Sequence, residues 1–184
     1  MRLAPFFLAL VLPLAAAAAT APKPARPVLD TLFDQLKQAD SPDTAKPIEQ
    51  HILGIFAQPE SATIELLITR ANAAAQAGEK DAARQLFEAI TTIAPNYAEG
   101  WHARANLQRA NNDDAGAMAS LEHVVVLNPR QFAALYELGT ILEDYGNKAG
   151  ALAFYRRALA LDPQLEGAQK HVDALSRDVE GQGI

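Results

Sequence analysis

Apolar residues recur at intervals of three and four positions along most of the chain, which is the spacing of an amphipathic helix. From about residue 61 onward this pattern itself repeats every 34 residues. Each copy holds two helical stretches, which we expect at 62–77 and 79–93, at 97–110 and 113–127, and at 131–145 and 148–161. The pattern therefore predicts an all-α fold made of three helix pairs.

Three prolines close the three copies, at Pro95, Pro129 and Pro163. A proline disfavours helical geometry in the residue before it, so each one helps to end the second helix of its pair. The other shared positions hold small or apolar residues: Ala71, Ala105 and Gly139; Ala83, Ala117 and Ala151; Phe87, Leu121 and Tyr155; Ile90, Val124 and Ala158. One pair cannot bury its own apolar face, so this period predicts units that stack into a solenoid.

These shared residues resemble the pattern of the tetratricopeptide repeat family, whose units are pairs of antiparallel helices. The three units would be 64–97, 98–131 and 132–165, and the third matches the family pattern most fully. In the first two units, Ala71 and Ala105 replace the glycine that Gly139 provides in the third. The resemblance implies a right-handed superhelical solenoid, in which the first helix of each unit lines a concave groove.

Further helices are predicted on both sides of the three units. Apolar spacing predicts helices at 28–39 and from about 44 to 56, so residues 28–60 should form an N-terminal helical hairpin. We expect this hairpin to pack against and cover the first unit, or to be a degenerate repeat that has lost the characteristic residues of the other units. After the third unit, an apolar stripe predicts a capping helix at about 164–178, within a repeat domain that spans 61–184.

The N-terminus is typical of a secretory signal peptide over residues 1–19. A short basic start precedes the apolar run Phe6–Ala19, which is too short to span a bilayer comfortably. Cleavage fits before Thr20 or before Pro22, and we expect the first because a proline directly behind the scissile bond hinders a protease. An uncleaved N-terminal anchor is the alternative. The proline-rich stretch 20–27 should be an extended tether.

Charge and cysteine content limit the partners and the compartment. The formal net charge is −6 and the chain has no basic run, which argues against nucleic acid as a partner. There is no cysteine to form a disulfide or to carry a lipid. Together with the signal peptide, these features predict a periplasmic or secreted protein that does not insert into the membrane after cleavage.

The resemblance also assigns a candidate peptide-binding or protein-binding groove. Its residues are Asn72, His102, Asn106, Arg109, Tyr136, Glu137 and Thr140. Asn72, Asn106 and Thr140 occupy the same position in successive units, so they would form a ladder of groups that donate and accept hydrogen bonds. An extended peptide offers unpaired N–H and C=O groups to such a ladder. The alternative is that these are hydrated surface residues with no ligand.

One subset of the family binds the C-terminal carboxylate of heat-shock chaperones through lysines, an arginine and asparagines. Only Asn72 matches that clamp here, and the other equivalent positions hold Ile68, Ala103, Ala133 and Glu137. Because Glu137 would repel a carboxylate, we do not expect this chain to bind such tails.

No catalytic motif is present, so we do not expect an enzyme, a cofactor or a metal site. Glu99 and His102 form the single Glu-x-x-His, whereas a carboxylate-bridged metal bundle needs two copies and further glutamates. The run Asn111–Asp114 falls in a turn, where Asp113 is a natural helix N-cap. The main hypothesis is a groove that binds an extended segment. The alternatives are an accessory subunit that docks by its convex face or its hairpin, and an enzyme whose chemistry the sequence does not reveal.

Overall fold

The computed structural model describes residues 26–181; the predicted signal peptide and most of the predicted tether lie outside them. This part of the chain folds into helices without strands, as the all-α prediction required. The helices are α1 (Arg26–Gln38), α2 (Pro42–Phe56), α3 (Ala62–Gln76), α4 (Lys80–Ile93), α5 (Ala98–Ala110), α6 (Asp114–Leu127), α7 (Phe132–Asp144), α8 (Lys148–Leu161) and α9 (Ala168–Glu180).

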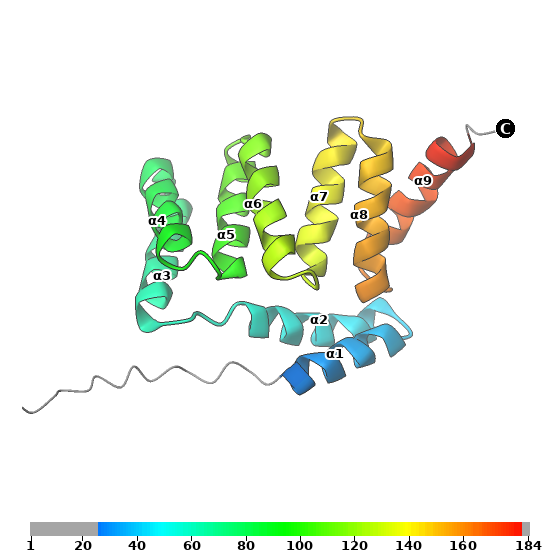
Figure 1. The fold of residues 1–184 in the computed structure, drawn as a ribbon, viewed down its shortest axis with the longest axis horizontal. Coiled ribbons are helices and arrows are strands. Elements are labelled where there is room, and N and C mark those ends of the chain that lie inside the picture. Colours follow the sequence, from blue (N-terminus) through cyan, green and yellow to red (C-terminus); the bar gives the residue numbers. More distant parts are fainter. Residues whose placement is uncertain (1–25, 182–184) are drawn as a thin grey trace, which may run out of the picture.

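The six helices α3 to α8 stand side by side as three antiparallel pairs (Figure 1). Their bounds agree with the predicted helices to within one or two residues. Helix α9 leans against α8, and α1 and α2 run crosswise beneath the lower ends of the row. The molecule is thus a stack of three units with a hairpin along one edge and a helix at one end.

Small residues let the two helices of each unit cross closely. Ala83, Ala117 and Ala151 have no exposed surface, and neither do Ala71 and Ala105. The third unit has Gly139 where these alanines stand, because a Cβ there would lie 2.7 Å from the ring of Tyr155. Phe87 and Leu121 fill the corresponding space in the other two units.

The turn inside each unit needs a residue with positive φ. Gly78 and Gly146 supply it with φ of 76°, and Asn112 adopts φ of 61° in the second unit. Asparagine is one of the few side chains that tolerate this left-handed conformation. In the second and third units the helix that follows starts on a side-chain cap, since Asp113 accepts from Gly116 N and Asn147 accepts from Gly150 N, whereas Glu79 makes no such bond at the start of α4.

The two junctions between units are packed differently. At the junction of the second and third units, Leu138 and Ile141 are buried in one cluster with Val124. The equivalent residues at the first junction are Arg104 and Leu107, which are only partly buried. At these two positions the first junction therefore buries less apolar surface than the second.

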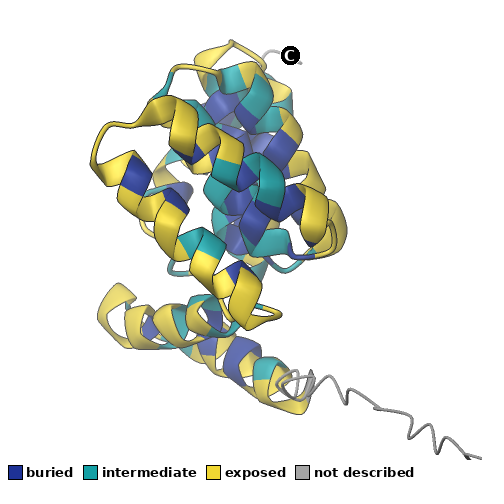
Figure 2. Ribbon diagram, turned by 90° about the vertical axis from the view of Figure 1, so that its left-hand side faces the viewer, coloured by how far each residue is buried: buried dark blue, intermediate teal, exposed yellow. Residues whose placement is uncertain are grey.

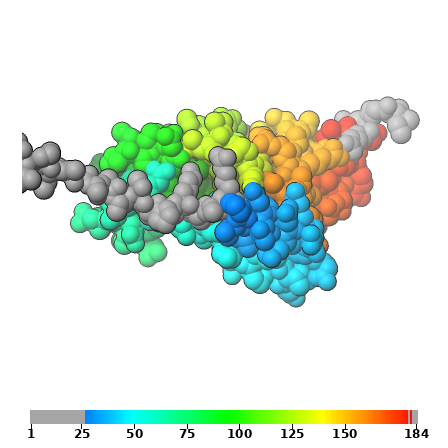
Figure 3. All heavy atoms as spheres, turned by 60° about the horizontal axis from the view of Figure 1, so that its bottom comes forward, coloured from blue at the N-terminus to red at the C-terminus, as the bar shows by residue number. Residues whose placement is uncertain are grey.

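The apolar face of the hairpin packs against the third unit and not the first, contrary to our expectation, and its end is joined to the first unit by a hydrogen bond from the Tyr97 hydroxyl to Ala57 O. Its apolar residues Phe33 and Ile52 share a cluster with Phe132, and Leu161 and Leu165 pack against the same cluster. All three of these partners belong to the third unit, and Figure 3 shows the hairpin beside the α8 side of the stack. The outward face of α3 stays largely exposed in the described structure (Figure 2), with Leu66 at 50%.

Polar contacts tie the hairpin to the loops between units. The guanidinium of Arg130 lies 3.9 Å from the ring centre of Phe33, pairs with Asp30 and donates to Leu29 O. Gln164, 34 residues later and at the same position of the next loop, donates to the carbonyl oxygen of Ala39 at 3.1 Å. The edge formed by these loops is therefore the docking surface of the hairpin.

Three helix starts differ from the predicted ones. Helix α1 begins at Arg26 and α2 at Pro42, two residues earlier in each case, because proline is tolerated in a first turn that needs no N–H partner. Ser41, between the two helices, is the N-cap of α2. Helix α9 starts later, at Ala168, because Gly167 takes φ of 81° directly before it.

Gly139→Ala should lower the free energy of unfolding by about 1 kcal/mol, since overpacking costs roughly 1 to 3 kcal/mol and exceeds the helix-propensity gain of about 0.5 to 1 kcal/mol. Gly54→Ala is the matched control, because no atom lies within 4 Å of its added Cβ, and it should stabilise. Urea denaturation followed by circular dichroism measures both. If Gly139→Ala stabilised as much as Gly54→Ala, the close approach of Tyr155 would be wrong.

Candidate binding groove

An open cavity of about 320 Å³ lies between α3 and α5, and we call it the α3–α5 groove. It is lined by Asn72, Ala75, Gly78, Lys80, Phe87, Ala103, Asn106, Leu107, Ala110 and Asn111. Phe87 and Leu107 give it an apolar lining, and the small side chains of α3 and α5 leave room between the two helices. The space suits a chain segment better than a compact polar ligand.

Two of the predicted groove residues face this cavity with free side-chain amides. Asn72 and Asn106 are exposed, and neither amide is hydrogen bonded within the described structure. They are 34 residues apart and come from α3 and α5. Each can donate one hydrogen bond to a peptide and accept another from it.

The third residue of the predicted ladder is occupied by contacts within the third unit. The hydroxyl of Thr140 donates to Tyr136 O at 3.1 Å and lies 3.4 Å from the hydroxyl of Tyr155. Tyr136 itself packs on the ring of Tyr155, with centroids 5.3 Å apart. The open ladder therefore spans the first two units.

Helix α9 adds a histidine to this end of the groove. His171 Nδ1 lies 2.7 Å from the carboxylate of Glu143, which also accepts the hydroxyl of Tyr155 at 2.8 Å. The His171 ring stacks on Tyr155 and meets Tyr136 edge to face. The residues of the third unit that would continue the groove are thus bound to the capping helix.

His102 and Glu137, both predicted as groove residues, form a tie between the second and third units. His102 is only 7% exposed, and its Nε2 lies 3.0 Å from Glu137 Oε1. Its Nδ1 lies 3.6 Å from Glu99 Oε2. Burial alone would lower the pKa of His102, but the interactions with Glu137 and Glu99 raise it to about 10.

This cluster of two carboxylates and one imidazolium carries a net negative charge next to the groove. Glu99 also accepts a hydrogen bond from Gln131 Nε2 at 3.4 Å. Arg109, the remaining predicted groove residue, lies 3.7 Å from Asp144 and 4.0 Å from Asp114, so its own charge is offset. The helices that line the groove, α3, α4 and α5, hold four carboxylates and five lysine or arginine side chains, and Lys80 is the charged residue among those that line the cavity itself.

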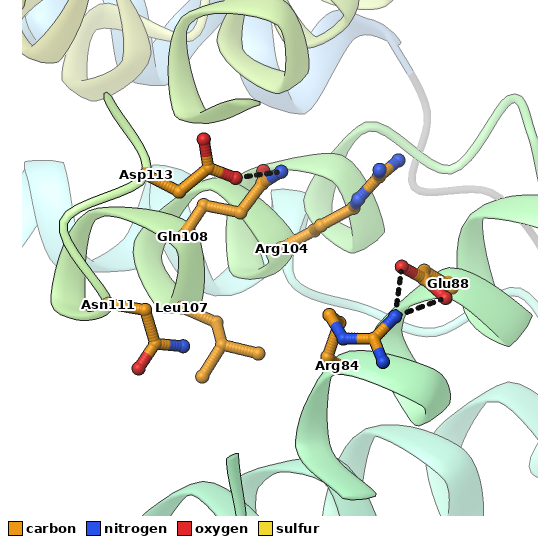
Figure 4. Close-up of a pocket in the computed structure, with 7 residues that line it drawn as sticks. All are labelled: Arg84, Glu88, Arg104, Leu107, Gln108, Asn111 and Asp113. Atoms are coloured by element: carbon orange, nitrogen blue, oxygen red, sulfur yellow. Dashed lines mark hydrogen bonds and ion pairs between the residues drawn. The ribbon is translucent and has the colours of Figure 1, made fainter. Parts of the chain in front are cut away.

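A second cavity, of about 280 Å³, lies between α4 and α5 at the first junction (Figure 4). Arg84 points toward Glu88 and donates to its carboxylate at 3.1 Å. Gln108 donates to Asp113 and accepts the hydroxyl of Ser120 at 2.6 Å. The lining holds two arginines and two acidic residues, so its charges balance and favour no ligand class.

Family models described as tetratricopeptide repeat match residues 64–107 and 132–165. A TPR repeat-containing protein of Rhizobium etli is 34% identical over 153 residues, which cover 83% of this chain and 75% of that protein. The chain belongs to the tetratricopeptide repeat family.

Several solved structures share the fold at low sequence identity. The Yersinia enterocolitica type III secretion chaperone SycD, in complex with a peptide of the translocator YopD, has a TM-score of 0.58 at 17% identity over 64% of this chain and 95% of that one. The first TPR of Spaghetti (RPAP3), bound to an HSP90 peptide, has a TM-score of 0.58 at 20% sequence identity. The match covers 64% of this chain and 93% of that one. MamA has a TM-score of 0.57 at 16% sequence identity, and the match covers 85% of this chain and 82% of that one.

Two further findings concern membranes and metals. None of the helices in the described range is long and apolar enough to cross a membrane. Between residues 26 and 181, no three histidine or acidic side chains gather in a way that could hold a metal ion.

Sequence reasoning missed the contacts that close the third tetratricopeptide repeat unit. His171 lies in the predicted capping helix next to Val172, on the side that the apolar stripe turns inward, so the helical spacing held a signal for it. Nothing in the spacing indicated that Glu143 would be its partner, because the two residues belong to different helices.

The His102 tie predicts a pH dependence of stability. Because the pKa of His102 is about 10 in the folded chain and about 6.5 when unfolded, its stabilisation is complete below pH 6.5 and is lost as the pH rises through 10. Between pH 6.5 and 9.5 the free energy of unfolding should fall by roughly 3 to 4 kcal/mol more in wild type than in His102→Gln. Urea denaturation of both at the two pH values checks this, and parallel behaviour would contradict it.

Proposed function

We propose that this tetratricopeptide repeat protein is an exported, non-catalytic module that holds an extended peptide or protein segment in the α3–α5 groove. The observation that carries the proposal is the pair of free amides, Asn72 and Asn106, at equivalent positions on either side of an open cavity. A strand-like segment has unpaired backbone groups along its whole length, and two amides in register can bind two of its peptide units.

The charge of the groove does not select an acidic or a basic segment. Lys80 is the charged side chain among the residues that line the cavity. Glu65 and Glu99 lie on α3 and α5, where Arg70, Arg104 and Arg109 offset them. The proposal therefore rests on hydrogen bonds to the backbone of the segment and on the apolar lining, not on Coulomb energy.

Other members of the fold support the class of ligand. The SycD structure contains a YopD peptide, and the RPAP3 structure contains an HSP90 peptide. Tetratricopeptide repeat proteins generally serve as binding modules without catalysis. The chaperone-tail ligand itself does not suit this chain, because Ile68 and Glu137 replace basic residues of the clamp.

An accessory subunit that docks through its N-terminal hairpin is the weaker alternative. The apolar face of the hairpin, including Phe33 and Ile52, already packs against the third unit of the same chain. Its outward residues, such as Lys46 and Gln50, are polar and exposed. Docking through the convex face stays compatible with groove binding, since the two surfaces are separate.

Asn72→Ala combined with Asn106→Ala should weaken peptide binding by roughly tenfold or more, because two lost hydrogen bonds remove about 1 kcal/mol each. The probe is a random-peptide library displayed on phage and selected on the protein from residue 20 onward. Affinities of the enriched peptides are then measured for wild type and the double variant by titration calorimetry.

Thr140→Val is the matched control, since its hydroxyl is used within the third unit and should not contact the peptide. It should bind enriched peptides within about twofold of wild type. Failure to enrich any peptide would overturn the proposed groove function. Equal losses in Thr140→Val and in the double asparagine variant would instead move the site toward the third unit.

We also propose export, with cleavage before Thr20 and a periplasmic or secreted location for the mature chain. The basic start, the apolar run and the small residues before Thr20 support it. Mass spectrometry of the chain expressed with its full N-terminus should find residue 20 as the first residue. Recovery of Met1 at the N-terminus would contradict export through a cleaved signal.

A further inference from the structure

A buried carboxylate lies where the hairpin meets the third unit. Asp162 follows α8 and has no exposed surface. One of its oxygens, Oδ1, accepts a hydrogen bond from Gln164 N at 3.1 Å. Its other oxygen, Oδ2, is buried without a hydrogen-bond donor in the described structure. An acceptor left unsatisfied in this way costs about 1 to 3 kcal/mol, so a donor is expected beside it.

The group that faces Asp162 from the hairpin is another carboxyl, that of Glu49 on α2. Glu49 is partly buried and lies between Ala45 and Ile52, the buried residues of the α2 face that packs with Phe132 of the third unit, and the Asp162 carboxyl is close enough to act on it. Two carboxylates in contact repel each other strongly where water is excluded, so one of them holds a proton. A protonated Glu49 supplies the donor that Asp162 Oδ2 lacks, and the pair then becomes a hydrogen bond between hairpin and solenoid.

The charges around the pair favour the protonated form. Burial and the charge of Asp162 raise the pKa of Glu49 from 4.5 to about 7, and Glu166 in the following loop adds to the rise. Lys46, one turn earlier on α2, opposes it. Burial likewise raises the pKa of Asp162.

The repeat itself indicates that Asp162 is not required by its turn. Asn128 stands at the same position of the second unit, 34 residues earlier, and its Oδ1 accepts a hydrogen bond from Arg130 N at 3.2 Å. An asparagine therefore serves the turn equally well. Only the third unit, which the hairpin covers, has an ionisable residue at this position opposite a glutamate.

We propose that Glu49 and Asp162 form a proton-dependent latch, which holds the hairpin against the third unit and releases it as the pH rises through neutrality. The latch binds a proton only when closed, so its stabilisation is complete below about pH 4.5 and is lost through about pH 7. Release would uncover Phe132 and Leu161 on the solenoid and Phe33 on the hairpin. These apolar side chains would then be available to a partner, independently of the α3–α5 groove.

Hydrogen exchange with mass spectrometry tests the latch through Glu49→Gln, which keeps a donor for Asp162 but does not titrate. At pH 5.5 the peptides from 28–56 should exchange at similar rates in wild type and variant. At pH 8 they should exchange roughly tenfold faster in wild type, as expected for a proton taken up on closing. Comparing the two proteins at the same pH cancels the intrinsic pH dependence of exchange, and peptides from α5 and α6 should not differ.

Asp162→Asn is the second variant, chosen because the second unit already has Asn128 at the equivalent position, and it should also remove the excess exchange of the hairpin at pH 8. If the hairpin of Glu49→Gln packs poorly on the third unit at both pH values, Asp162→Asn still tests the latch. Loss of the pH effect in either variant, confined to 28–56, supports the latch. Equal exchange of wild type and both variants at pH 8, or a difference spread equally over α5 and α6, would overturn it.

Discussion

Two helices of a unit approach closely only where their facing side chains are small, and each unit depends on that approach to bury the larger residues beside it. Ala105 and Ala117 fix the spacing of the second unit, and Gly139 with Ala151 fixes that of the third. A single unit is not expected to be stable alone, because part of its apolar surface is buried only by its neighbours. The stability of the groove therefore depends on the stack as a whole.

The junctions between units decide where the surface stays open. Leu138 and Ile141 close the second junction with apolar packing, while Arg104 and Leu107 leave cavities on both sides of α5 at the first. The third unit is closed further by His171 of α9. A peptide segment can enter the open groove at the first junction without breaking hydrogen bonds of Asn72 or Asn106. In the third unit it would first have to displace the contacts of Thr140, Tyr136 and His171.

Period and helical spacing predicted the units, their turns and the capping helix, because these are consequences of local pattern. Contacts between distant elements were not predictable in the same way. His102 has helical neighbours that suggest a surface position, yet Glu137 of the next unit draws it into a buried ion pair. The binding role of Asn72 and Asn106 stays a prediction, since the sequence and the structure establish their position but not their ligand.

The position of the hairpin illustrates why such contacts escape a periodic pattern. Its docking edge is repeated in every unit, but the residues on it are not: the position of Phe132 holds Ile64 and Ala98 in the other units, and that of Leu165 holds Tyr97 and Gln131. The second unit has no large apolar side chain at either position, and Ile64 and Tyr97 are buried in the cluster of the first unit itself. The third unit presents Phe132 and Leu165 next to Arg130, and the hairpin packs there, past its sequence neighbour. Ile93, at the same position as the covered Leu161, consequently remains 61% exposed in the first unit. The unit on which the hairpin docks is thus decided by residues that differ between units. The fold of each unit is decided by the residues that the units share.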